Sequence, residues 1–143
     1  MIQERINVEV DPDTPRRLAA FIEDFCSRAG IAPDLRFPFD LALEEIAVNL
    51  LTHGAGSERT PRHLTAEVSL FEDRLELKIL DDGPAFDPLT LPPPDVTAQL
   101  ESRQVGGYGL HLLRSMMDEV EYSYSVGCNA LRLAKRVPCK AGN

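Results

Sequence analysis

Hydrophobic and polar residues alternate over residues 2–10, where the apolar positions are Ile2, Ile6, Val8 and Val10. This period of two predicts a half-exposed strand, which we expect at the edge of a sheet. A period of three to four follows and predicts a helix, with Asp13 or Thr14 as its cap and Gly30 at its end. The apolar positions of this helix are Leu18, Phe21, Ile22, Phe25 and Cys26.

A second helical pattern begins near Asp40, after residues 31–38, whose two prolines predict a connecting loop. Its apolar stripe consists of Leu43, Ile46, Ala47, Leu50 and Leu51. Glu45 and Asn49 are four residues apart and therefore lie together on another face of this helix. Asparagine is a poor helix former, so its presence there slightly favours a specific role over that of a solvated polar side chain.

The second half of the chain predicts four strands and one helix. Strands at 63–71 and 74–81 flank Glu72 and Asp73, which predicts a hairpin. Residues 87–105 contain four prolines and no steady period, and a loop of this length is usually functional or disordered. A third helix is predicted at about 108–118. Two closing strands follow at 119–126 and 129–137, joined by Gly127 and Cys128.

The predicted order of elements is strand, helix, helix, strand, strand, loop, helix, strand, strand. Because hairpins join neighbouring strands, the sheet should be mostly antiparallel. Three helices of this length pack most naturally on one face of such a sheet. The fold class is therefore a two-layer α/β (α+β) sandwich, and we expect residues 1–143 to form a single domain.

Composition narrows the classes of partner. The formal net charge of −8 disfavours nonspecific binding to nucleic acid or to an anionic membrane, because both require a basic surface. No apolar run approaches the roughly 20 residues of a membrane-spanning helix. The three cysteines are odd in number and far apart, which argues against a disulfide framework or a zinc site. A reducing cytoplasm is the simplest location.

Two motifs carry the candidate chemistry. An acidic turn, DDGPAF, begins at Asp81 and closes the apolar strand LELKIL. A glycine-rich run, GGYGL, begins at Gly106 and opens the third helix. Glycines at that place let the backbone approach a ligand. They also leave the first amides of the helix pointing outward at the positive end of its dipole, which suits phosphate.

Together with LEEIAVN in the second helix, these motifs resemble the boxes of the GHKL ATPase superfamily, which has the histidine-kinase-like ATPase (Bergerat) fold. Within that superfamily, the chain specifically resembles the small bacterial anti-sigma-factor serine/threonine-protein kinases. The resemblance covers nearly the whole chain, including the closing stretch NALRLAK. It implies ATP and Mg²⁺ as the nucleotide and its metal.

The resemblance also implies roles for single residues. Asn49 would bind Mg²⁺ and Glu45 would be the general base. Asp81 would accept a hydrogen bond from the adenine amino group, while Gly83 would let the backbone approach the base. Residues 88–105 would form a lid over the nucleotide. The phosphates would lie against Gly106, Gly107, Tyr108, Gly109 and Leu110.

Two positions depart from the family pattern. Ala85 stands where the acidic box has its second glycine, so its methyl group could narrow the approach to the base. Ala130 stands where many relatives carry a threonine near adenine. Both changes bear on the affinity for nucleotide, and neither alters Asn49 or the glycine-rich run.

The leading functional prediction is an ATP-dependent serine/threonine protein kinase that acts as a regulatory switch. By resemblance it would bind a sigma factor, or phosphorylate an anti-sigma-factor antagonist, and it could form a homodimer. A nucleotide-gated binding module without kinase activity is the alternative, and Ala85 keeps it open. A structural adaptor without nucleotide is a third class, against which Asn49 and the glycine-rich run argue.

Overall fold

The computed structural model describes residues 1–54, 62–85, 87 and 107–138. Its five strands form one sheet in the order β1-β2-β3-β5-β4, in which every neighbouring pair is antiparallel. The bounds of the strands are Ile2–Glu9 for β1, His63–Leu70 for β2, Arg74–Asp81 for β3, Glu119–Ser125 for β4 and Cys128–Arg136 for β5. The predicted edge position of the first strand is confirmed, as are both hairpins.

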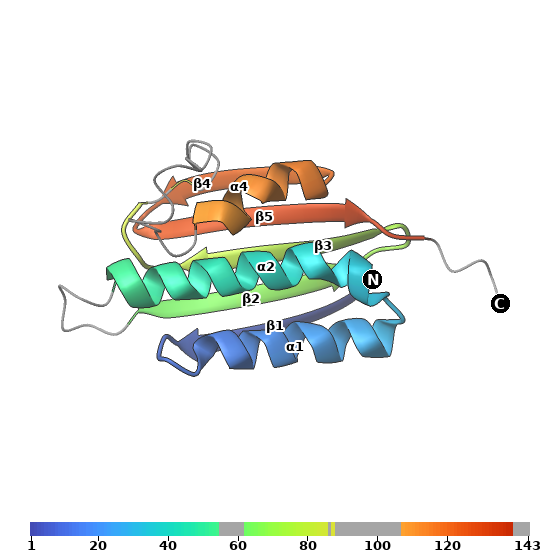
Figure 1. Ribbon diagram of the computed structural model, residues 1–143, viewed down its shortest axis with the longest axis horizontal. Helices are drawn as coiled ribbons and strands as arrows, with labels where there is room; N and C mark the ends of the chain where they lie inside the picture. Colours follow the sequence, from blue (N-terminus) through green and yellow to red (C-terminus); the bar gives the residue numbers. More distant parts are fainter. Residues whose placement is uncertain (55–61, 86, 88–106, 139–143) are drawn as a thin grey trace.

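Three α-helices cover one face of this sheet (Figure 1). They are α1 (Thr14–Ala29), α2 (Pro33–Asn49) and α4 (Gly107–Met116), and the π-helical turn η1 (Leu50–Gly54) continues α2. The predicted two-layer sandwich with a mostly antiparallel sheet is therefore confirmed. In the described part of the chain, no helix is long and apolar enough to cross a membrane.

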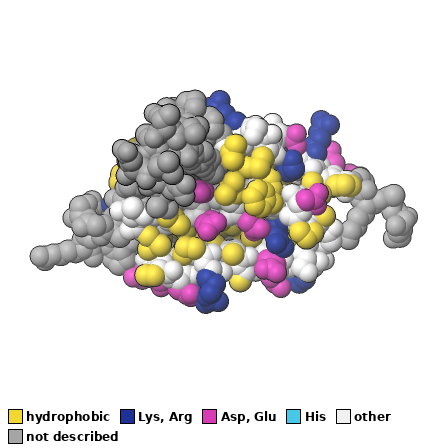
Figure 2. Space-filling model, in the orientation of Figure 1, with side chains coloured by type: hydrophobic (Ala, Val, Ile, Leu, Met, Phe, Trp, Pro, Cys, Tyr) yellow, Lys and Arg dark blue, Asp and Glu magenta, His cyan; other side chains and the backbone are white. Residues whose placement is uncertain are grey.

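The core lies between the two layers. Each strand alternates, so that one set of side chains enters the core and the other set remains in solvent. Largest among the fully buried side chains are Phe25 of α1 and Phe39 of α2, which pack over the leucine and isoleucine residues of the central strands. The large hydrophobic residues left exposed on the helices are Phe37 and Leu112 within the described residues. Figure 2 shows hydrophobic side chains on this face, where α2 and α4 lie side by side.

The expected loop at 31–38 is wrong, because α2 already begins at Pro33. Proline fits the first position of a helix, where its missing N–H group has no partner in any case and its φ angle is already helical. Pro38 lies inside α2 and removes one hydrogen bond from the helix. Pro38 is buried, and an ion pair of 2.9 Å between Arg36 and Asp40 spans its position. Tertiary packing thus outweighs the local signal of both prolines.

The start of α1 and its N-cap residue, Asp13, agree with the prediction, but no side-chain hydrogen bond caps the helix. Asp13 occupies the N-cap, yet its carboxylate pairs with Arg16 and makes no capping hydrogen bond. The hydroxyl of Thr14 instead accepts a hydrogen bond of 2.9 Å from the backbone N–H of Asp11. Gly30 ends α1 in the left-handed conformation, with φ of 75°, as expected for a glycine at that place.

Candidate functional site

Glu45 lies on the C-terminal half of α2, and its carboxylate is partly buried. Its Oε2 atom is shielded from solvent and has no hydrogen-bond partner among the described residues. Burial raises the pKa of this carboxyl, and the neighbouring charge of Glu44 raises it further. A carboxylate that lacks an internal partner and holds a proton more readily than usual is suited to accepting a proton from a ligand.

Asn49 follows one turn later and is the last residue of α2. The structure records no hydrogen bond to its side-chain amide from the residues it describes, so both the oxygen and the nitrogen can meet a ligand. Directly after it the chain widens into the π-helical turn Leu50–Gly54. Such turns are rare in proteins and frequently occur at functional sites.

Asp81 is the last residue of β3, and only 9% of its surface is exposed. Its Oδ1 atom accepts one hydrogen bond of 2.9 Å from the backbone N–H of Gly83 and another of 3.0 Å from the side-chain amide of Asn129. Burial raises the pKa of the Asp81 carboxyl, and these hydrogen bonds only partly offset that effect. Since both recorded hydrogen bonds end on Oδ1, the Oδ2 atom is left for an external donor.

Gly83 brings the acidic turn against the end of α2. A Cβ atom built on Gly83 would lie 2.7 Å from Cδ2 of Leu50 and 3.0 Å from Oδ1 of Asp81. Glycine fits this close approach without any rearrangement, whereas an added methyl group would require the side chain of Leu50 to shift. The contact brings the turn that carries Asp81 next to the residue that follows Asn49.

Asn129 is a site residue to which the sequence assigned no role. It is the first residue of β5 whose side chain faces the core, and it is the cross-strand partner of Asp81. This pairing places its side chain beside the Asp81 carboxylate. Its amide nitrogen donates to Asp81, to the carbonyl of Gly83 at 3.1 Å and to the carbonyl of Pro84 at 2.9 Å. A signal was present in the sequence, because a polar side chain heads the alternating apolar positions Leu131 and Leu133.

The glycine-rich run lies at the start of α4. Gly107, Tyr108, Gly109 and Leu110 form the first turn of this helix, which packs beside α2. That agrees with the prediction that these glycines open a helix, one residue earlier than expected. Gly106 and the predicted lid at 88–105 lie outside the described residues. Ala85 is exposed at the end of the acidic turn.

These residues fit a magnesium–nucleotide complex. An asparagine amide oxygen is a hard, neutral ligand of the kind that Mg²⁺ accepts alongside phosphate oxygens and water. Oε2 of Glu45, which is shielded and has no partner among the described residues, lies one helical turn from Asn49. The Asp81 carboxylate, in which only Oδ1 accepts hydrogen bonds from the protein, lies in the acidic turn next to the end of α2. An acceptor suited to an amino donor and an amide oxygen suited to a hard cation therefore lie in one region of the structure.

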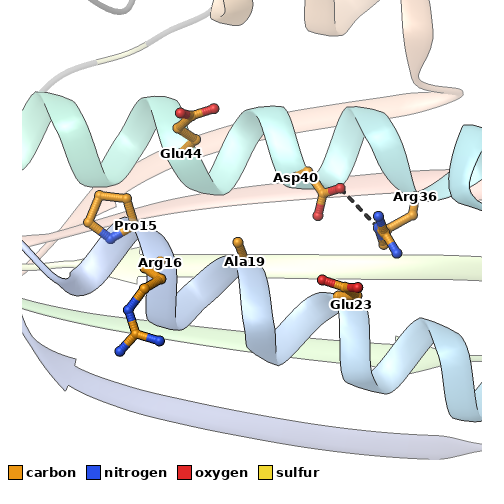
Figure 3. Close-up of a pocket in the computed structure, with 7 residues that line it drawn as sticks. All are labelled: Pro15, Arg16, Ala19, Glu23, Arg36, Asp40 and Glu44. Atoms are coloured by element: carbon orange, nitrogen blue, oxygen red, sulfur yellow. Dashed lines mark hydrogen bonds and ion pairs between the residues drawn. The ribbon is translucent and has the colours of Figure 1, made fainter.

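A separate groove of about 390 Å³ runs between α1 and α2 (Figure 3). It is lined by Pro15, Arg16, Ala19, Glu23, Arg36, Asp40 and Glu44. Among the described residues, none that is predicted to bind nucleotide lines this groove, because Glu45 and Asn49 occupy a different face of α2.

Comparisons with known proteins identify the family to which this chain is similar. The model of a family described as the histidine kinase-like ATPase domain matches residues 8–135. The serine-protein kinase RsbW of Listeria monocytogenes is 30% identical over 114 residues, which span 77% of this chain and 72% of that protein. The serine/threonine-protein kinase BtrW of Bordetella bronchiseptica is 30% identical over 133 residues, or 91% of each chain.

A solved structure shows the same fold. The crystal structure of the RsbU and RsbW domains of a Mycobacterium tuberculosis protein aligns with 97% of this chain and 34% of that one, with a TM-score of 0.67. Its sequence identity is 12%, so this likeness concerns the fold alone.

Proposed function

This chain belongs to the histidine kinase-like ATPase domain family, and we propose that it is an ATP-dependent serine/threonine protein kinase that acts as an anti-sigma factor. The observation that carries the proposed chemistry is the shielded Oε2 of Glu45, which has no partner in the described structure and lies one turn before Asn49. A solvated helix surface would not leave a carboxylate oxygen desolvated without a partner.

The adenine base would be recognised by the acidic turn. Oδ2 of Asp81 would accept a hydrogen bond from the adenine amino group, because Oδ1 is already engaged within the protein. Gly83 would allow the base to lie close to the backbone, with Ala85 at the margin of the same turn. The backbone amides from Gly106 to Leu110, including those of Gly107, Tyr108 and Gly109, would hold the phosphates at the positive end of α4.

Asn49 would hold Mg²⁺ through its amide oxygen. When bound, the ion neutralises charge on the phosphate oxygens of the nucleotide. The residue after Asn49 packs against Gly83, so the metal ligand and the adenine turn are held in a fixed relation. Phosphoryl transfer depends mainly on such positioning and on electrostatic stabilisation, rather than on covalent chemistry by the protein.

Glu45 would act on the incoming hydroxyl. It accepts the proton of a serine or threonine hydroxyl as that oxygen bonds to the γ-phosphorus and the bond to the departing ADP breaks. The pKa of this carboxyl is raised toward neutral pH, and a general base is most effective when its pKa lies near the pH at which the enzyme works. The products are a phosphorylated protein and ADP.

The proposed protein substrate is an anti-sigma-factor antagonist, and the proposed second partner is a sigma factor. Both assignments rest on the motif resemblance to the anti-sigma-factor kinases, and the name of one relative, serine-protein kinase RsbW, supports a role in phosphorylating a protein. Phosphorylation of the antagonist would release it and leave the kinase free to hold the sigma factor. We propose that this exchange takes place in the cytoplasm, with the kinase able to form a homodimer and with no direct contact to nucleic acid or membrane.

The alternative is a nucleotide-gated binding module without transfer. Ala85 favours it, since this position departs from the glycine of the family pattern. The two functions differ in one respect only, namely whether phosphate reaches a partner protein.

Transfer of radiolabelled phosphate from ATP to candidate antagonists, taken from the proteins of neighbouring genes, would test the proposal. Glu45→Gln should keep ATP affinity but slow transfer about 10²–10⁴-fold, as expected for the loss of a general base. Asn49→Ala should lose Mg²⁺-dependent ATP affinity together with transfer. Glu44→Gln is the matched control, because Glu44 is the exposed neighbour on the same helix.

The outcomes separate the two functions. ATP binding by the wild-type protein without transfer to any antagonist would reject the kinase and support the binding module. Transfer at the wild-type rate by Glu45→Gln would show that the base is another residue. A large loss in the Glu44→Gln control would point to Glu44 in its place.

A further inference from the structure

Asp81 does not stand alone in the acidic turn, because a chain of hydrogen bonds from two further strands holds it. The hydroxyl of Tyr122 on β4 donates to Oδ1 of Asn129 on β5, and the amide nitrogen of Asn129 donates to Oδ1 of Asp81 on β3. The chain thus crosses three adjacent strands of the sheet. The sequence and the family comparisons assign no role to Tyr122 or Asn129.

The sheet register puts these side chains together. Asp81 and Asn129 are direct partners in the antiparallel pair of β3 and β5. Tyr122 pairs with Leu131, which places it diagonally from Asn129 on the same face of the sheet. Asn129 is 5% exposed and Tyr122 packs against the core, so water competes poorly for these hydrogen bonds.

The surroundings of Asn129 fix which end of its amide faces Asp81. Three acceptors converge on the nitrogen, namely Oδ1 of Asp81 and the carbonyls of Gly83 and Pro84. On the opposite end, the oxygen receives the Tyr122 hydroxyl. Rotating the amide by half a turn would set its oxygen against three acceptors, so a single orientation is strongly preferred.

This orientation has a consequence for the carboxylate. Oδ1 of Asp81 already receives two hydrogen bonds, one from Asn129 and one from Gly83, so rotation of the carboxylate would break both. Oδ2 is thereby kept as the acceptor that a ligand meets. A lone acceptor at that place favours a base with an amino donor, such as adenine, over one that presents a carbonyl oxygen.

We propose that Asn129 and Tyr122 are positioning residues that reserve Oδ2 of Asp81 for the adenine amino group, and so set the base specificity of the nucleotide site. This inference rests on the proposed adenine site. It adds that residues of β5 and β4, far from Asp81 in the sequence, determine how selectively the site binds adenine over other bases.

The test compares two nucleotides that differ by one group. Purine riboside 5′-triphosphate lacks the amino group of ATP, so the ratio of the two affinities isolates the contact with Asp81. Calorimetry would measure that ratio for wild type, Tyr122→Phe and Tyr124→Phe. Tyr124 is a matched control, since it lies two residues away on the same strand and is exposed.

Tyr122→Phe should lower the affinity for ATP about two- to tenfold, the effect of one hydrogen bond, and should bring the affinity ratio closer to one. Tyr124→Phe should leave both affinities and the ratio unchanged. Asn129→Ala should lower ATP affinity about tenfold or more. It should also lower the ratio of ATP affinity to purine riboside 5′-triphosphate affinity more than Tyr122→Phe does. Thermal unfolding of each variant would confirm that it is folded.

Equal losses for both nucleotides in Tyr122→Phe would overturn the inference, because a purely structural role weakens them alike. An unchanged ATP affinity in that variant would overturn it as well. Wild-type protein that binds the two nucleotides equally, or binds neither, would instead refute the proposed adenine site, and the inference would fall with it.

Discussion

Replacing Gly83 by alanine tests how the acidic turn is joined to the end of α2. The new Cβ would lie 2.7 Å from Cδ2 of Leu50, whereas ordinary contacts of this kind begin at 3.4 Å. The leucine must therefore move by about 0.7 Å, the difference between these two distances, or the turn must retreat. Leu50 is 6% exposed, so its side chain has little room to give way. Overpacking of this kind typically costs about 1–3 kcal/mol of folding free energy.

A double-mutant cycle separates this clash from other effects. Leu50→Ala alone should cost about 2–5 kcal/mol, because it opens a cavity in the core. The methyl group of Gly83→Ala would then have space, so the double variant should be more stable than the summed losses predict, by about 1 kcal/mol or more. Urea unfolding followed by circular dichroism would provide all four free energies.

Gly127→Ala is the control for this cycle. Gly127 lies in the turn between β4 and β5 with φ of 74°, and a Cβ atom there would meet nothing within 4 Å. Its replacement should cost about 1–2 kcal/mol through backbone strain and should add independently to Leu50→Ala. Additive losses for Gly83→Ala and Leu50→Ala would refute the proposed contact between the turn and α2. A wild-type stability for Gly83→Ala would refute it equally.

Three further predictions concern the buried ionisable groups of Asp81 and Cys26. Asp81→Asn should weaken ATP binding by about 1.5–3 kcal/mol, because an amide can present a donor to the adenine amino group; calorimetry would measure the loss. Burial raises the Asp81 pKa above its ordinary 3.8, so just above pH 3.8 this carboxyl binds more protons in the folded than in the unfolded state, and its contribution to stability should fall as pH rises through that range. Asp81→Asn should lose this slope, which urea unfolding at several pH values would detect. Burial raises the pKa of the Cys26 thiol to about 11, so iodoacetamide at pH 8 should label the less buried Cys128 but spare Cys26, as mass spectrometry of the folded protein would show.

The local pattern predicted most of the fold. Alternation at period two located the strands, and glycines at Gly30 and at the start of α4 marked a helix end and a helix beginning. The pattern failed at residues 31–38, where two prolines indicated a loop and α2 was found instead. Each proline affects only one backbone hydrogen bond and one φ angle. The burial of Phe39 and its neighbours stabilises the whole helix and outweighs that local cost.

The candidate site was predicted unevenly. Glu45 and Asn49 could be related from the sequence, because four residues along a helix bring two side chains to one face. Their assigned roles, like those of Asp81 and the glycine-rich run, stay predictions. The sequence could not show that Oε2 of Glu45 is shielded without a partner, since that depends on the elements packed around α2.

Local periodicity in the sequence determined which segments become strands and helices and which faces they bury, because these properties depend on neighbours within a few residues. Tertiary structure alone decided the pairing of Asp81 with Asn129, which are 48 residues apart, and the addition of Tyr122 through β4. That pairing depends on the register of β3 with β5. A shift of one residue would turn the asparagine to the other face of the sheet, so the register that buries the leucines also sets the acceptor that a nucleotide meets.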